Sequence, residues 1–282
     1  MQIYSINFLD FKKNQYVNFN ARTKNPLQFK NSDFFVKIRG YGRNTDWAEK
    51  IISTADTAVT QICSKAKLQT VLSDIAEGVR IANQYPLDIR KREDTGILRL
   101  RLEGWRHRSD WGNGDILTPY GKKSKYKPYE ERLDKIYYFP LTNPYNDIEL
   151  TIPNLEYQGF GIDKCLEHAP AKYIKNALIK IENLYNNLLD NYMGKKISDS
   201  NLVNINNTIA EIRWILAHST PWERGSDAIA NVFTRALYKA FDIKTYPLKE
   251  NLSLDLEAYC TELADYKKNF ASYFEIAPHI VK

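Results

Sequence analysis

The sequence predicts an α+β protein that is predominantly helical, with a C-terminal helical bundle and a β-containing N-terminal half. Apolar residues recur at spacings of three and four through most of the second half of the 282 residues. Near the N-terminus, short aromatic and β-branched runs alternate with turn residues instead. Hydrophobic residues make up 43% of the chain, which is enough to bury a core. We therefore expect a mixed α/β region at 1–165 and a helical region at 166–282, packed as one unit.

The N-terminal region is predicted to hold two helices among short strands. Asn44 offers N-cap chemistry for the first helix, whose apolar stripe runs from Trp47 to Ile62. The second helix covers Leu68–Ala82 and ends before Pro86. Strand-forming side chains or an alternating pattern predict strands at 3–8, 16–19, 34–38, 97–102, 135–139 and 147–152.

The C-terminal region is predicted to form four amphipathic helices. Among them, Ile229–Phe241 has the most regular apolar pattern in the chain. The four helical patterns cover Tyr173–Leu189, Ile205–Leu216, Ile229–Phe241 and Leu254–Phe270.

Net charge and hydropathy narrow the class of partner. Lys and Arg number 40 against 34 Asp and Glu, which leaves a net charge of +6. This mild excess favours anionic partners such as nucleotides, and it lacks the clustering that nucleic-acid binding requires. The N-terminus has no secretory-signal pattern, and no run of about 18 apolar residues predicts a membrane span. We expect a protein that works in a cytosol.

Cysteine and histidine spacing predicts no metal site. The three cysteines are far apart and form no CxxC pair, so neither a zinc site nor a disulfide framework is expected. A reducing compartment is the simplest setting for such cysteines. His168 and the other isolated histidines lack the spacing of metal ligands and are read as ordinary residues.

The candidate working site is the short turn between the second and third C-terminal helices, His218–Asp227. A helix opening near Ser226 has first-turn amides without intrahelical acceptors and a positive dipole end, which together favour an anion. Gly225 lacks a side chain that would keep a ligand from these amides. We therefore predict phosphate binding by the set Arg224, Gly225, Ser226 and Asp227.

Two residues of this turn can move protons. His218 has an ordinary pKa near neutrality, and Glu223 is the other candidate general base. A purely structural interpretation stays open, because helix corners commonly contain Pro, Gly and Ser. In that interpretation Trp222 is a core residue and His218 a partner of the helix C-terminus.

A second anion-binding feature precedes the middle of the chain. Arg99 and Arg101 alternate onto one face of a predicted strand, and Arg106 follows beside an aromatic residue. These three arginines could clamp a phosphate or carboxylate. The alternative is a surface strand with its charged positions turned outward.

The turn resembles the core of the Fic/Doc (Fido) superfamily, in which a helix ends in HPFxxGNGR and leads into a second apolar helix. Here TPWERGSDA matches at the proline, the aromatic residue and the first glycine. Thr220 stands at the position of the family's catalytic histidine, and Ser226, Asp227 and Ala228 replace the Asn, Gly and Arg. The resemblance covers about 40 residues around the turn. It is greatest to divergent members such as the AvrB-type bacterial effectors, which keep the fold without the motif.

This resemblance implies an effector or toxin that moves a nucleotide or nucleotide-sugar moiety onto a host protein. Its donor would be ATP or another nucleotide, with or without Mg²⁺, and its partner a host protein. The implied route is delivery into a host cell by secretion that needs no signal peptide. Two alternatives stay open: a catalytically inactive scaffold that binds a partner protein, and another toxin activity such as ADP-ribosylation or RNA cleavage centred on the arginine-rich strand.

Overall fold

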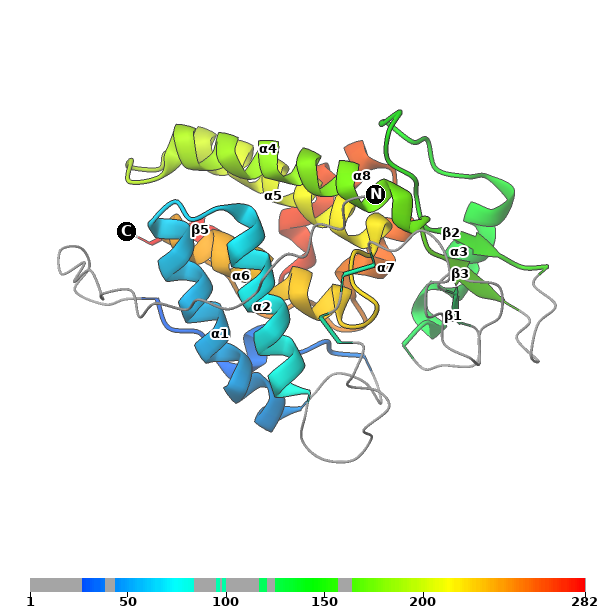
Figure 1. Cartoon of the computed structure of the whole chain (residues 1–282), viewed down its shortest axis with the longest axis horizontal. Helices are drawn as coiled ribbons and strands as arrows, with labels where there is room; N and C mark the ends of the chain where they lie inside the picture. The colour runs from blue at the N-terminus through cyan, green and yellow to red at the C-terminus, as the bar shows by residue number, and fades with distance from the viewer. Residues whose placement is uncertain are drawn as a thin grey trace, which may run out of the picture.

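The computed structural model describes residues 27–38, 44–83, 95–96, 98–99, 117–120, 125–156 and 164–281. The predicted strands 3–8 and 16–19, most of 97–102, and the candidate residues Arg101 and Arg106 lie outside the described residues. Helices dominate the described part, and the strands are few and short (Figure 1). This confirms the predicted fold class.

The helices include all the strongly periodic segments of the sequence. They are α1 (Thr45–Cys63), α2 (Leu68–Ala82), α3 (Glu130–Tyr138), α4 (Ile174–Tyr192), α5 (Asp199–Ser219), α6 (Ser226–Ala240), α7 (Leu254–Tyr259) and α8 (Leu263–Asn269). In the described part, β1 (Leu117–Pro119), β3 (Cys165–Glu167) and β2 (Ile152–Asn154) form an antiparallel sheet in that order. A second antiparallel pair joins β4 (Ile243–Lys244) to β5 (His279–Ile280).

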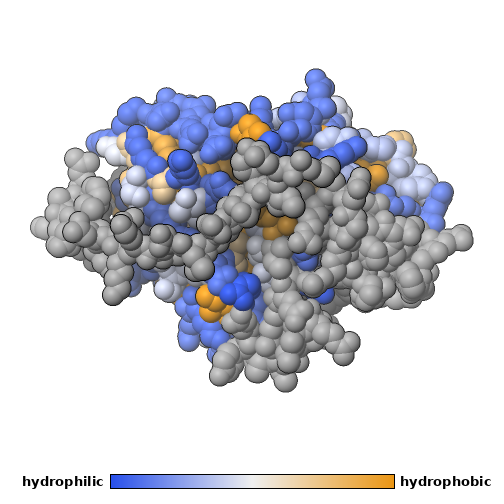
Figure 2. Space-filling model, in the orientation of Figure 1, coloured by the Kyte–Doolittle hydropathy of each residue, from blue (hydrophilic) through white to orange (hydrophobic). Residues whose placement is uncertain are grey.

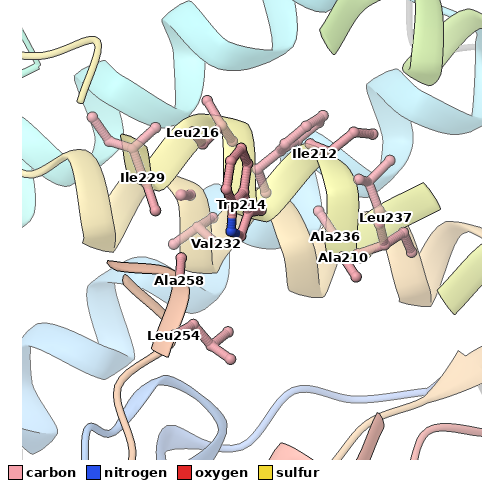
Figure 3. Close-up of a cluster of buried hydrophobic side chains, with 14 of the residues drawn as sticks. Ala210, Ile212, Trp214, Leu216, Ile229, Val232, Ala236, Leu237, Leu254 and Ala258 are labelled. Atoms are coloured by element: carbon pink, nitrogen blue, oxygen red, sulfur yellow. The ribbon is translucent and has the colours of Figure 1, made fainter. Parts of the chain in front are cut away.

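The helix α6 lies at the centre of the molecule. Eleven of its 15 residues are buried, more than one amphipathic face can supply. Its neighbours α1 and α2 pack on it from one direction, and α5 packs on it from another. Beside α6, the fully buried Trp214 of α5 donates from its indole N–H to the carbonyl of Thr261, 3.1 Å away, and is surrounded by aliphatic side chains of α5, α6 and α7 (Figure 3).

The hydrophobic core includes residues from both predicted regions. Ile51 and Ala55 of α1 and Ile75 of α2 belong to the same buried cluster as Val232 and Leu237 of α6. A division of the chain at residue 165 stays a prediction. Among the described helices, none combines the length and the apolar character that crossing a bilayer requires. On the face shown in Figure 2, the described surface is largely hydrophilic, with small separate apolar areas.

Three predicted elements are wrong. The predicted strand 135–139 belongs mostly to α3, because Leu133 anchors a helical face on the core. At 34–38 a 3-10 turn (Asn31–Phe34) precedes extended chain, because the Asp33 carboxylate accepts from the Lys30 amide at 2.8 Å. The segment 254–270 is two helices rather than one, since α7 ends at Tyr259 and α8 begins at Leu263. In addition, the strand expected at 147–152 begins only at Ile152.

The predicted cap of α1 is confirmed. The side-chain oxygen of Asn44 accepts from the Trp47 amide at 2.9 Å. The helix ends after Cys63, and α2 begins five residues later, which makes α1 and α2 neighbours that cross closely. At the crossing, Gly78 of α2 faces Thr54 of α1. A Cβ placed on Gly78 would lie 2.2 Å from the Thr54 hydroxyl oxygen and 2.9 Å from its Cβ.

We predict that Gly78→Ala destabilises the protein, although alanine normally favours a helix over glycine by about 1 kcal/mol. Rotation of Thr54 cannot relieve the clash, because the threonine Cβ itself is too close. Overpacking of this kind costs about 1–3 kcal/mol. Urea unfolding should show this loss in Gly78→Ala and its relief in Gly78→Ala combined with Thr54→Gly. A Gly78→Ala variant as stable as the wild type would contradict the close crossing.

Candidate functional site

The turn between α5 and α6 has two residues in the left-handed backbone region. Thr220 has φ 40° and ψ 64° and ends α5, while Gly225 has φ 83° and precedes α6. Glycine adopts this region readily, but a β-branched residue does so at a cost. Such a conformation persists where surrounding contacts hold it, and it is frequent at functional sites.

A segment from the middle of the chain holds this turn. Two of its residues form isolated bridges to the turn, Thr95 with Arg224 and Leu98 with Trp222. The Gly96 amide donates to the Arg224 carbonyl at 3.1 Å, and the Arg99 amide donates to the Pro221 carbonyl at 2.8 Å. The turn is therefore paired with a strand-like segment more than 120 residues earlier.

The side chain of Arg99 completes this support. It is 3% exposed, and its guanidinium donates to the carbonyls of Thr220 at 2.7 Å, Ser219 at 2.9 Å and Ala169 at 3.0 Å. Carbonyls at a helix C-terminus lack intrahelical donors, so a cation is favourable there. Arg99 positions the turn in this structure, and the phosphate contact predicted for it stays a prediction.

Gly225 and Ser226 also have structural contacts. A Cβ on Gly225 would lie 3.2 Å from Thr95 Cγ2 and 3.4 Å from Val79 Cγ1, so this face of the glycine is covered by protein. The N-cap of α6 is Gly225, and Ser226 is the first residue of the helix. The Ser226 hydroxyl donates to the Trp222 carbonyl at 3.0 Å and accepts from the Trp222 amide at 3.1 Å. Phosphate binding by these two residues would have to use their backbone amides.

His218 is fully buried in an aromatic environment. Its ring centre lies 4.1 Å from that of Trp214 and 5.5 Å from that of Tyr259, and its Nε2 is 3.1 Å from the Ala258 carbonyl. Burial lowers the pKa of His218 to about 3, so the ring is neutral at physiological pH. A ring that has no contact with solvent cannot reach the hydroxyl group of a bound substrate to remove its proton. This weighs against the general-base role predicted for His218.

Four charged residues meet beside the start of α6. Arg213 of α5 is fully buried and forms an ion pair through Nη2 with Asp227, whose side chain is 24% exposed. Within the described part of the chain, the Nε and Nη1 of Arg213 have no hydrogen-bond partner. Lys125 donates to Asp255 at 3.0 Å, and Asp255 also accepts from the Ser253 hydroxyl and the Leu256 amide.

The surroundings shift the pKa values of the two carboxyl groups in this charged cluster, Asp227 and Asp255, in opposite directions. Burial and the negative charge of Asp255 raise the pKa of Asp227 above its ordinary value, although Lys125 and Arg213 oppose this. Burial acts in the same direction on Asp255, but there Lys125 and Arg213 outweigh it, so the pKa of Asp255 is lowered. Two neighbouring carboxyls whose pKa values are shifted in opposite directions are an arrangement that acid–base sites use.

Thr220, at the position of the superfamily's catalytic histidine, has a histidine beside it from elsewhere in the chain. Its hydroxyl lies 3.1 Å from Nδ1 of His168, whose Nε2 is 2.8 Å from the Thr118 hydroxyl. Thr151 also lies 3.1 Å from Nδ1 and donates to the His218 carbonyl at 2.7 Å. The imidazole therefore joins the turn to the three-stranded sheet, a contact that sequence spacing could not predict.

The remaining predicted residues lie at the edge of the turn. Glu223, Arg224 and Asp227 are all partly exposed. Sequence reasoning missed Arg213, although a charged residue between Ile212 and Trp214 within an apolar helix was a usable signal. In the part of the chain that the structure describes, no three His, Cys, Asp or Glu side chains are grouped as metal ligands.

Comparison with known protein families found a similarity over part of the chain. Residues 151–277 match the AvrB_AvrC family model, described as avirulence protein. The matched span contains β2, β3, α4–α8, the turn and all the site residues after position 150. No curated protein matches the chain. This part of the protein is thus similar to the avirulence proteins and consistent with an AvrB-like bacterial effector, whereas the link to Fic/Doc stays a prediction.

We predict that His218→Gln flattens the dependence of stability on acid. The folded pKa is about 3 and the ordinary value 6.5, so the unfolded chain takes up this proton first as the pH falls. Stability from the neutral ring is fully present above pH 6.5 and is lost toward pH 3. Between pH 6.5 and about pH 5, the free energy of unfolding should fall by about 2 kcal/mol less in His218→Gln than in the wild type. Parallel curves would show that the histidine is not buried and neutral.

We also predict that Arg213→Leu destabilises the protein strongly. The change leaves Asp227 and Asp255 in the interior with one cation fewer, and breaking a buried pair costs about 3–5 kcal/mol. Asp227→Asn in the same background should recover part of this loss, because it removes the uncompensated charge. Arg80→Leu is the matched control, since the Arg80 pair with Glu77 is exposed. Additive losses in the double variant would refute a direct Arg213–Asp227 coupling.

Proposed function

We propose that the protein is an effector delivered into a host cell, where it transfers a nucleotide or nucleotide-sugar moiety onto a host protein. The observation that carries this proposal is the buried Arg213, two of whose nitrogens find no hydrogen-bond partner among the described residues, paired to the partly exposed Asp227 at the start of a helix. The similarity of residues 151–277 to avirulence proteins supports the effector part.

The start of α6 supports anion binding. The first intrahelical bond runs from the Ile229 amide to the Gly225 carbonyl at 2.8 Å, so the three preceding amides have no acceptor within the helix. Residues 225–228 are partly exposed, and Arg224 adds a cation at the same edge. Helix amides and arginine together suit the phosphates of a nucleotide donor. Any Mg²⁺ would enter with those phosphates, as is usual for nucleotide-bound magnesium.

Asp227 is the proposed base because it forms an ion pair with Arg213, so that protonation of Asp227 changes the charge balance around Arg213. A hydroxyl of the host protein attacks the donor, and its proton passes to Asp227 as the new oxygen–phosphorus or oxygen–carbon bond forms. The bond to the phosphate leaving group breaks, and that group departs with the electron pair. Once Asp227 is neutral, it no longer compensates the positive charge of the buried Arg213, and this charge then favours the negative charge that develops on the leaving phosphate. Glu223, also partly exposed, remains the alternative base.

A second candidate is a scaffold that binds a host protein without catalysis. It is favoured by the internal use of several polar groups of the turn. The Ser226 hydroxyl, three donors of Arg99 and Nε2 of His218 all have partners within the protein. Groups that are hydrogen-bonded within the protein are not available to a ligand, and a scaffold would not require them to bind one.

Calorimetry with ATP and with nucleotide sugars tests binding, and mass spectrometry of host proteins from cells that express the chain tests transfer. We predict that Arg224→Ala weakens nucleotide binding roughly tenfold, the effect of losing one charge-assisted contact. Asp227→Asn should keep nucleotide binding but lower transfer by about 100-fold or more, the usual contribution of a general base.

Two surface variants are the matched controls. Arg80→Ala removes an ion pair within α2, and Asp56→Asn removes the pair between α1 and Lys239 at the far end of α6. Both should leave binding and transfer unchanged. Absence of nucleotide binding would overturn the transferase. Host-protein association that survives both Arg224→Ala and Asp227→Asn, with no added mass on any target, would support the scaffold instead.

A further inference from the structure

A groove of about 690 Å³ lies between α2 and α4, apart from the charged cluster. Its walls are mostly apolar, and Trp222 and Leu98, which form a bridge with each other, are among the residues that line it. Trp222 and the α2 residues Leu68 and Leu72 border it although only 2–4% of each residue is exposed. Ile179 on the α4 wall is 47% exposed, which marks the open side. A volume of this size is typical of pockets for small organic ligands.

The two walls run in opposite directions. The Tyr185 hydroxyl of α4 donates to the Ala66 carbonyl just before α2 at 2.9 Å, which fixes one end of the pair. Residues near the start of α4 therefore lie opposite the later part of α2, where Ala76 and Gly96 line the groove. From Lys172 to Glu182 the α4 wall extends about 15 Å, at roughly 1.5 Å per residue. The groove is long and narrow.

Charge is unevenly distributed along this length. Lys172 and Lys175, both exposed, line the end near Trp222 and Gly96. Glu182 lines the opposite end, beside the start of α2. An anionic group is therefore attracted to the lysine end and repelled from the other. Between the two ends the wall residues of α4 are Leu178 and Ile179, which offer only apolar contact.

We propose that this groove binds a single-chain anionic amphiphile, a fatty acid or an acyl chain with an anionic head. The aliphatic chain would lie along Leu72, Leu178 and Ile179, and the head would face Lys172 and Lys175. A bound helix is less suited, because an α-helix is about 10–12 Å in diameter and about 15 Å of it would exceed the groove volume of about 690 Å³. The proposal is independent of the transferase.

Displacement of cis-parinaric acid by dodecanoate, in the full-length protein, tests this site. Dodecanoate should compete at micromolar concentration, and dodecanol, which lacks the charge, should compete at least fivefold less well. Ile179→Glu places a carboxylate on the open wall and should weaken dodecanoate binding at least tenfold. Lys172→Glu combined with Lys175→Glu should reduce the preference for dodecanoate over dodecanol.

Val203→Glu is the matched control, because Val203 is 57% exposed on α5 and lies outside the groove. It should bind dodecanoate like the wild type. Co-sedimentation with vesicles of anionic phospholipid distinguishes an acyl chain in a membrane from a free fatty acid. Binding to either source supports the proposal if Ile179→Glu abolishes that binding. Absence of binding below the micelle concentration, or equal loss in Val203→Glu, would overturn it. So would displacement by an acidic helical peptide but by no fatty acid.

Discussion

The structure depends on one buried charge, the guanidinium of Arg213 in the middle of the apolar helix α5. A charge away from water is tolerated only if opposite charges or hydrogen-bond partners compensate it. Asp227 at the start of α6 forms the ion pair with Arg213. Asp255, in the first turn of α7, adds a second negative charge nearby and is itself paired with Lys125. Segments far apart in the sequence are thus required to meet at one place. That place is also the opening of α6, so the demands of stability and of a site coincide there.

The turn above this cluster is rigid for a related reason. Its strained threonine, Thr220, is held by hydrogen bonds from the side chain of Arg99 to the surrounding carbonyls and by the contact of its own hydroxyl with His168. Every one of these supports comes from a different part of the chain. A rigid turn keeps the helix start in a fixed position relative to Arg213, and such preorganisation is what a binding or catalytic site needs.

Sequence periodicity predicted α1, α2, α4, α5 and α6 well, because each buries a regular apolar stripe. It failed at α3, where the aromatic and β-branched residues near Tyr138 have strand-like composition but only Leu133 is fully buried. The turn was predicted as the candidate site from its short length and its titratable residues, and this stays a prediction. His168 and Asp255 were not predicted near it, because they approach it only through tertiary structure and no local pattern records such contacts. Arg99 was predicted as an anion clamp, and the structure shows that it contacts carbonyls of the turn.

The choice of a base shows why composition alone misleads at such a site. His218 has the ordinary pKa best suited to proton transfer at neutral pH, yet burial against Trp214 and Tyr259 keeps it neutral and enclosed. Asp227 has an ordinary pKa that is too low, yet burial and the neighbouring Asp255 raise it while part of its side chain still reaches solvent. Ordinary pKa values favour His218 over Asp227 as a general base, whereas the surroundings of the two residues in the structure favour Asp227. Partial access to solvent and the adjacent charge of Arg213 are the observations that favour Asp227 over His218 in the proposed role.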